Sequence, residues 1–330
     1  MRVKVGSMLS CLAAVVVLTV ACGDDLDDLA ADPQDVTAPQ IAFVSDRDGY
    51  TRIYAMDEDG SNQRALSDPQ FGSDTYPTWS PDGSQIAFVS YRDLHRAYPE
   101  IYVMDADGEN ERNITNAPDS DDTHPAWSPD GRSIVFVSDR GFEPRRRRIH
   151  IMDTDGENVR RVPRGGDTLS PPEWPSWPIG SRDGASIYLR TSLGEIITMG
   201  ADGTDRRRLT SFERGNRYMF RWFAVSPDER SLAIVEGEYE REEVVVVDVP
   251  GEGRRVVVSD PLAYHDAPAW SPDGRRIAYT SIYAAGFERR GRADIHVVNL
   301  DDLSVTRLTN SRDYDGMPAW EPASAWEPAF

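Results

Sequence analysis

Polar side chains gather just ahead of a tryptophan phrase that returns along the chain, and their types could do chemistry. Carboxylates, imidazoles and phenols that converge on one place could bind a cation, a basic peptide end or a polar ligand. The candidates are Asp74, Tyr76, Asp122, His124, Asp167, Arg217, Tyr218, His265, Asp266, Tyr314 and Asp315. Alternatively, each Asp caps its own turn or bonds the backbone of the next unit. Which interpretation holds depends on the elements that carry these residues.

The tryptophan phrase repeats with a period of about 50 residues, which indicates a solenoid, a propeller or an array. Its full form, Pro-x-Trp-Ser-Pro-Asp-Gly, occurs at 77–83, 125–131 and 268–274. Altered copies occur at 175–178, 225–228 and 318–322. In the copy at 175–178 we align Trp177 with the tryptophans of the full phrases.

Each unit contains alternating apolar runs separated by turn residues. One unit continues from its phrase into Ile86–Ser90 and then Ile101–Asp105, and a short strand ends at Thr115. Runs of this kind, bounded by Pro, Asp and Gly, are typical of antiparallel strands. With the strand around each Trp, the pattern predicts four strands per unit and therefore an all-β propeller.

The two ends of the repeat complement each other. The run at 41–45 has no tryptophan phrase before it, whereas the phrase at 317–322 has no run after it. We therefore predict that residues 317–322 supply the innermost strand of the first unit. This closure makes the fold a six-bladed β-propeller over residues 39–322, followed by a tail at 323–330.

The phrase and the run after it, Pro-x-Trp-Ser-Pro-Asp-Gly-x-x-Ile-Ala-Phe, resemble the repeats of the TolB-like family of propellers. The best copies lie at 77–88, 125–136 and 268–279, and the resemblance covers essentially all of 39–322. It implies a six-bladed propeller and a role in the bacterial cell envelope. The founding member of that family carries a separate α/β domain ahead of its propeller and works with a peptidoglycan-associated lipoprotein. Here a short linker precedes the first unit.

The N-terminus indicates export. Arg2 and Lys4 precede an apolar stretch that runs to Val20, and Ala21 and Cys22 follow it. About fourteen residues span roughly 20 Å as a helix, which is short of a hydrocarbon core of about 30 Å. We interpret residues 1–21 as a signal peptide. The stretch resembles a bacterial lipoprotein signal, which implies a lipid on Cys22, whereas the alternative is ordinary secretion with cleavage nearby.

Composition limits the partners. The formal net charge is −20, which disfavours nucleic acid and anionic lipid as main ligands. Residues 22–38 are acidic and poor in aromatic side chains, so we expect a disordered tether there. Both cysteines lie within residues 1–22, so we expect no disulfide in the propeller, and a domain of this size needs none. We expect a monomer in the periplasm or at the outer cell surface.

The sequence gives little support for catalysis. It contains no Gly-x-Ser-x-Gly, His-Glu-x-x-His or phosphate-binding loop. His150 and His296 fall where other units carry Tyr54 and Tyr102, which predicts structural roles. The sequence therefore favours a non-catalytic binding or scaffold module that needs no cofactor and binds an envelope protein or peptide. The alternative is a carbohydrate or polar-ligand binder, or a metal-assisted lyase-like enzyme, that uses His124 and His265 at the channel mouth.

Overall fold

The computed structural model describes residues 40–322, except for 69–71, 93–97, 142–146, 164–174, 192–193, 211–221, 239–240, 250–252 and 284–291. The predicted signal peptide, the tether with Cys22, and the tail at 323–330 lie outside the described residues. The described residues belong to one compact unit. Every regular element in them is a strand.

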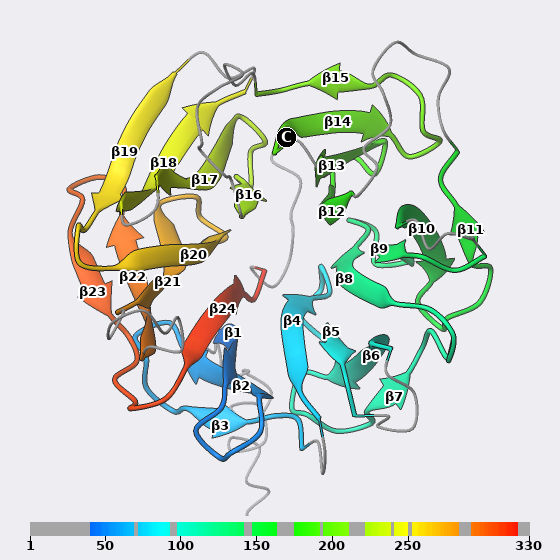
Figure 1. Ribbon diagram of the computed structural model, residues 1–330, viewed down its shortest axis with the longest axis horizontal. Coiled ribbons are helices and arrows are strands. Elements are labelled where there is room, and N and C mark those ends of the chain that lie inside the picture. Colours follow the sequence, from blue (N-terminus) through cyan, green and yellow to red (C-terminus); the bar gives the residue numbers. More distant parts are fainter. Residues whose placement is uncertain are drawn as a thin grey trace, which may run out of the picture. The chain divides into compact units, whose positions relative to one another are not determined.

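The strands form six four-stranded sheets, which stand around a common centre in Figure 1. The first sheet contains β24 (Asp315–Trp320), β1 (Gln40–Ser45), β2 (Arg52–Asp57) and β3 (Arg64–Ala65). The second contains β4 (Asp74–Trp79), β5 (Gln85–Ser90), β6 (Glu100–Asp105) and β7 (Arg112–Asn113), and the third β8 (Asp122–Trp127), β9 (Ser133–Ser138), β10 (Arg148–Asp153) and β11 (Arg160–Arg161).

The last three sheets follow the same order. The fourth contains β12 (Ser176–Gly180), β13 (Ser186–Arg190), β14 (Ile196–Gly200) and β15 (Arg207–Arg208). The fifth contains β16 (Phe223–Val225), β17 (Ser231–Glu238), β18 (Arg241–Asp248) and β19 (Arg254–Ser259). The sixth contains β20 (Tyr264–Trp270), β21 (Arg276–Ile282), β22 (Ala293–Asn299) and β23 (Val305–Arg307). The predicted six-bladed β-propeller is confirmed.

The ring closes as the sequence predicts. Strand β24 pairs antiparallel with β1, and Trp320 lies opposite Ile41 in the register. Beyond the ladder, the Glu321 backbone N–H donates to the Gln40 carbonyl oxygen at 2.7 Å. The C-terminal strand, red in Figure 1, therefore completes the first blade beside the blue β1.

In the blades that carry the full phrase, the Ser-Pro-Asp-Gly turn connects the first and second strands. In the second blade the Ser80 hydroxyl donates to Asp82 Oδ1 at 2.6 Å and accepts the Gln85 N–H at 2.9 Å. Gly83 follows with φ of +71°, a conformation that glycine adopts at little cost. The phrase therefore recurs because one turn geometry recurs, and this face of the ring is called the hairpin face below.

Three of the phrase tryptophans join neighbouring blades. The indole N–H groups of Trp79, Trp127 and Trp270 donate to backbone carbonyl oxygens of the preceding blade, at 3.1–3.3 Å. The acceptors belong to Ala319, Thr78 and Ala224, each one residue before the phrase-tryptophan position of its own blade. Each indole thus fills an interblade space and satisfies its single donor there.

The predicted alignment of Trp177 is wrong. The hairpin of the fourth blade is built by Ser181 and Asp183, whose Oγ–Oδ1 bond of 2.6 Å repeats that of Ser80 and Asp82. Counting back from this turn places Gly180 where Trp79 stands, and Trp177 where Tyr76 stands. The misalignment arises because Pro175 and Pro178 both flank a tryptophan, so a short proline-tryptophan pattern fits the wrong register.

Candidate functional site

The innermost strands carry a bulge that turns one side chain of each toward the channel. The ladder of β4 with β5 shifts between Thr75 and Thr78, and the equivalent shift occurs in β8, β12, β20 and β24. The bulged residues have positive φ without being glycine: Tyr76 (56°), His124 (54°), Trp177 (49°), Ala267 (48°) and Met317 (52°). Such backbone costs free energy and recurs at functional sites. Trp222 lies four positions ahead of Ser226, the first turn residue of the fifth blade, as Trp177 lies four positions ahead of Ser181 in the fourth, so Trp222 holds the sixth such position by sequence.

Four of these six positions carry rings that touch one another across the channel. Neighbouring centroids lie 4.8 Å apart for Tyr76–His124, His124–Trp177 and Trp177–Trp222. Tyr76 and Trp222, which belong to opposite blades, stack at 5.8 Å. We call Tyr76, His124, Trp177 and Trp222 the channel aromatic cluster. It lines a cavity of about 440 Å³ that extends toward Pro81 and Pro227 on the hairpin face.

Burial keeps the cluster uncharged. It lowers the pKa of His124 to about 3, with a smaller contribution from Arg147, and it raises the pKa of Tyr76 to about 12. His124 Nδ1 lies 3.0 Å from the Thr123 hydroxyl oxygen. A neutral imidazole among aromatic rings suits contact with apolar or aromatic surface better than proton transfer near neutral pH.

The candidate aspartates at the starts of three inner strands are buried. Asp74, Asp122 and Asp315 each have 0% exposure, so their carboxylates are not open to solvent in this structure. Each pairs with an arginine that follows the second strand of the same blade. The Nη2–Oδ distances are 2.7 Å for Arg92–Asp74, 2.5 Å for Arg140–Asp122 and 2.8 Å for Arg47–Asp315.

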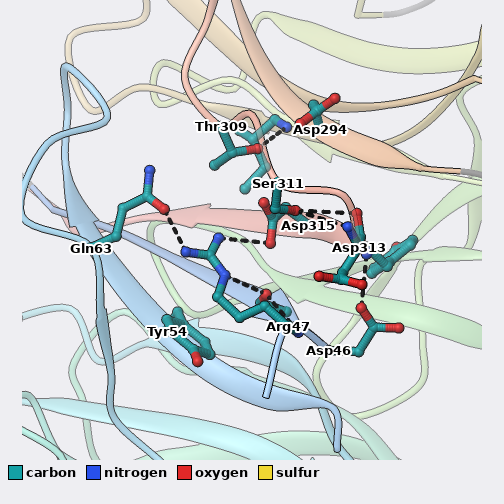
Figure 2. Close-up of polar contacts among 12 residues, drawn as sticks. Asp46, Arg47, Tyr54, Gln63, Asp294, Thr309, Ser311, Asp313 and Asp315 are labelled. Atoms are coloured by element: carbon teal, nitrogen blue, oxygen red, sulfur yellow. Dashed lines mark hydrogen bonds and ion pairs between the residues drawn. The ribbon is translucent and has the colours of Figure 1, made fainter. Parts of the chain in front are cut away.

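The arginines of these pairs are also fixed by aromatic stacking. In Figure 2, Arg47 lies between Asp315 and Gln63, with the Tyr54 ring beside it. Its guanidinium carbon is 4.9 Å from the Tyr54 ring centroid and 5.6 Å from that of Phe43. Arg92 and Arg140 stack on the equivalent phenylalanines. We call this repeated arrangement the aspartate–arginine clamp, and it holds the inner strand to the rest of its blade.

The pKa values of Asp74 and Asp122 reflect two opposing effects, because burial raises them and the paired arginines lower them. Burial raises the pKa of Asp122 to about 6, and the Arg140 guanidinium opposes that rise. Burial raises the pKa of Asp74 in the same way, against the pull of Arg92. Because their carboxylates are committed to internal pairs, these residues act in the scaffold that positions the channel.

The sixth blade replaces the clamp with aromatic side chains. His265 occupies the aspartate position and is 1% exposed, and Tyr279 packs edge-on against it with ring centroids 5.3 Å apart. Burial lowers the pKa of His265 to about 4, although Asp260 opposes the shift. Burial raises the pKa of both Tyr76 and Tyr314, and the nearby Asp266, the residue after His265, adds to each rise.

The remaining candidates divide into structural residues and residues that the structure does not describe. His150 and His296 pair with Phe136 and Tyr279, as Tyr54 and Tyr102 pair with Phe43 and Phe88, so their predicted register is confirmed. Asp167, Arg217 and Tyr218 lie outside the described residues. Sequence reasoning missed Trp177 and Trp222 as channel residues. Counting back from each Ser-x-Asp turn would have found both.

The alternative of a metal-assisted lyase-like enzyme would require a set of metal-ligating side chains, and the described part of the chain contains no such set. There, no group of three or more His, Cys, Asp or Glu side chains could hold a metal ion. The two candidate histidines lie in different surroundings, since His124 contacts Tyr76 and Trp177 whereas His265 contacts Tyr279. Aromatic rings supply no hard ligand for a divalent cation.

No helix in the part of the chain that the structure describes is long and apolar enough to cross a bilayer.

Comparison with solved structures shows the fold. TolB from Acinetobacter baumannii superposes with a TM-score of 0.68 at 21% identity, over 86% of this chain and 67% of that one. A structure of the nidogen/laminin complex gives 0.67 at 14% identity, over 87% and 100%. An oligogalacturonate lyase in complex with manganese gives 0.53 at 15% identity, over 81% and 73%. At these identities the likeness concerns architecture alone.

Comparison of sequences shows the family. The Tol-Pal system protein TolB of Alcanivorax borkumensis is 39% identical over 56 residues, which is 17% of this chain and 12% of that protein. The same protein of Desulfosudis oleivorans is 34% identical over 71 residues, 22% of this chain and 16% of that one. These matches span less than a fifth of either relative. The model of the TolB beta propeller domain matches residues 70–216 and 190–326, so this chain belongs to the TolB beta propeller domain family.

Proposed function

We propose that the protein is a non-catalytic binding module of the bacterial cell envelope, and that an envelope protein or peptide binds at its channel. The observation that carries this proposal is the channel aromatic cluster. Four rings meet at the channel, three of them on backbone with positive φ, inside a scaffold in which Asp74, Asp122 and Asp315 are paired with arginines. Aromatic side chains that line a concave site are the usual anchors of protein recognition.

The site differs from the one that the sequence favoured. Of the candidates that the sequence offered, Asp74, Asp122 and Asp315 are clamp residues, whereas Tyr76 and His124 belong to the cluster. His265, Asp266 and Tyr314 remain candidates beside them, and so does Arg217. The rings of the channel aromatic cluster are apolar and uncharged, so we infer that the bound segment presents an apolar or aromatic side chain.

Removing two opposed rings is expected to abolish partner capture. Tyr76→Ala with Trp222→Ala deletes the stacked pair across the channel, and losing an interface anchor typically costs 2 kcal/mol or more, about thirtyfold in Kd. The measurement is cross-linked capture from native envelopes, quantified by mass spectrometry. A stoichiometric protein held by the wild type should be absent from the double variant.

The matched control is Tyr50→Ala, which removes a tyrosine that is 44% exposed and outside the channel. It should capture the same protein as the wild type. Equal capture by the double variant, with its fold intact by circular dichroism, would move the site away from the channel.

We also propose that the protein is exported and anchored by lipid on Cys22. Relatives named for the Tol-Pal system support an envelope location, and the apolar stretch before Cys22 supports processing there. A diacylated or triacylated cysteine binds membranes stably, whereas a single chain binds only marginally. Cys22→Ser is therefore expected to move the protein from the detergent phase to the aqueous phase on fractionation. Retention in the detergent phase would contradict the anchor.

A further inference from the structure

The phrase tryptophan of the sixth blade is less buried than its counterparts. Trp79, Trp127 and Trp320 are 6–8% exposed, whereas Trp270 is partly exposed. Trp270 lines a cavity of about 620 Å³, and all of the residues around this cavity belong to the fifth and sixth blades. These two blades are neighbours in the ring (Figure 1). We call the cavity the interblade pocket.

A short side chain on the fifth blade accounts for part of this space. The residue whose backbone N–H donates to the turn serine is Arg276 in the sixth blade and Ser231 in the fifth. From this position the Arg276 guanidinium carbon reaches to 5.0 Å from the Trp320 ring centroid of the next blade, and its Nη2 lies 2.7 Å from Glu58 Oε2. Ser231 cannot cover Trp270 in the same way, and both residues line the pocket.

The turn that the sixth blade packs against the fifth is also altered. In each of the first four blades a turn glycine lies so close to a backbone carbonyl group of the preceding blade that no side chain would fit: Gly60, Gly108, Gly156 and Gly203. The corresponding turn of the sixth blade, from Asn299 to Ser304, contains no glycine and is one residue longer than that of the first blade. Arg255 of the fifth blade spans the gap and donates from Nη2 to the Leu300 carbonyl oxygen at 2.7 Å.

The charged groups around the pocket are mostly acidic. They are Asp228, Asp248, Asp273, Arg254 and Arg255. Arg254 is already paired, since its Nη2 lies 2.5 Å from Glu236 and 3.2 Å from Glu243. Asp228 and Asp273 use Oδ1 to accept the hydroxyl groups of their own turn serines, which leaves the second oxygen of each for a ligand. The pocket therefore favours a cation.

Asp248 differs from its equivalents in the other blades. In the first three blades the aspartate that ends the third strand accepts from the side-chain amide of an asparagine five residues later, at 2.6–2.7 Å: Asp57, Asp105 and Asp153. Five residues after Asp248 stands Gly253, which has no side chain and lines the pocket. The Asp248 carboxylate is exposed, so it can accept from a ligand in the pocket.

We propose that the interblade pocket binds a guanidinium group. The contact of Arg276 with Trp320 and Glu58 shows the arrangement that the fold provides, a flat cation over an indole with a carboxylate beside it. In the pocket Trp270 supplies the ring and Asp248 supplies the carboxylate. The site is separate from the channel aromatic cluster and does not depend on it, although Pro227 and Trp270 border both cavities.

The proposal is tested with N-acetyl-arginine amide, and with N-acetyl-citrulline amide as its neutral isostere. By ligand-observed NMR and calorimetry the wild type should bind the first probe, more weakly as salt rises, and should not bind the second. Free L-arginine distinguishes the sources of the group. Tighter binding of the amide would indicate a peptide arginine, and tighter binding of the free amino acid a small guanidinium compound. No binding of either arginine probe, or equal binding of the citrulline probe, would overturn the proposal.

Filling the pocket from within locates the site. Ser231→Arg gives the fifth blade the side chain that the sixth blade has at this position, and it should abolish binding of N-acetyl-arginine amide. The matched control is Ser186→Arg, the same change at the equivalent position of the fourth blade. There the next blade carries Val225 in place of the tryptophan, so this variant should bind like the wild type.

Two further variants keep the test decisive. Asp248→Asn, an exposed change that should not disturb folding, should weaken binding about two- to fivefold. Adding Arg276→Ser to Ser231→Arg vacates the equivalent place beside Trp320 and should restore binding. Binding that survives Ser231→Arg in a folded protein, that is unchanged by Asp248→Asn, or that the double variant fails to recover would contradict the assignment.

Discussion

A chain that stops after Gly316 is expected to lose cooperative folding, which is the largest effect we predict. The truncation removes most of β24, the only partner of the inner edge of β1, together with Trp320, which is 7% exposed. Replacing a core tryptophan by alanine typically costs about 3–5 kcal/mol, out of a total stability of about 5–15 kcal/mol. The truncation also leaves β1 as an unpaired apolar edge strand, which favours aggregation.

Thermal unfolding followed by circular dichroism, with light scattering, measures this loss. The matched control is a chain that stops after Pro322, which keeps all of β24 and its ladder to β1. It should retain a cooperative transition, with at most the smaller loss caused by removing residues 323–330. A Gly316 truncation that melts like the Pro322 truncation would contradict closure through β24.

The second large effect concerns the aspartate–arginine clamp. Arg140→Met is expected to destabilise the protein by about 3 kcal/mol at neutral pH, because it leaves the buried Asp122 carboxylate without its cation. Asp122→Asn should cost less, since the Arg140 side chain is 23% exposed and can be hydrated. Urea unfolding of each variant measures the difference. Arg132→Met, a change to an exposed arginine of the same blade, is the control and should be nearly silent.

The pH dependence of Arg140→Met follows from the same pair. Burial already raises the pKa of Asp122 to about 6, and losing the guanidinium that opposes this rise raises it further. A carboxyl whose folded-state pKa lies above its unfolded value gains stability as pH falls through the folded pKa. The deficit of Arg140→Met relative to the wild type should therefore shrink between pH 7 and pH 5. A deficit that grows on acidification would contradict this account of the clamp.

The residues of the clamp form a repeated pattern that can be recognised in the sequence. Each clamp arginine ends a Ser-x-Arg phrase, at 45–47, 90–92 and 138–140. Asp74 and Arg92 are 18 residues apart, as are Asp122 and Arg140. That fixed spacing indicates a structural pair, and it favours the interpretation in which the aspartates bond within their own units. An aspartate considered without its repeated arginine partner is easily assigned to a binding site instead.

Local sequence patterns were sufficient to predict the architecture of the propeller. Turn chemistry and strand patterning are local, so each Ser-Pro-Asp-Gly hairpin and each apolar run could be recognised from a few neighbouring residues. The complementary ends of the repeat then required the last strand to join the first. Closure was predictable because an unpaired edge at Ile41–Ser45 would have been costly.

Which side chains line the channel could be assigned only from the three-dimensional structure. Counting back from each Ser-x-Asp turn identifies the equivalent residue in every blade, but only the tertiary structure shows that the backbone bulges at this position, with positive φ at Tyr76, His124 and Trp177. The burial of Asp122 likewise depends on tertiary packing, which brings its carboxylate against the Arg140 side chain. Local sequence specifies the units, whereas contacts between units, which join residues some 50 positions apart, determine which side chains face the channel, lie in the core or leave a cavity.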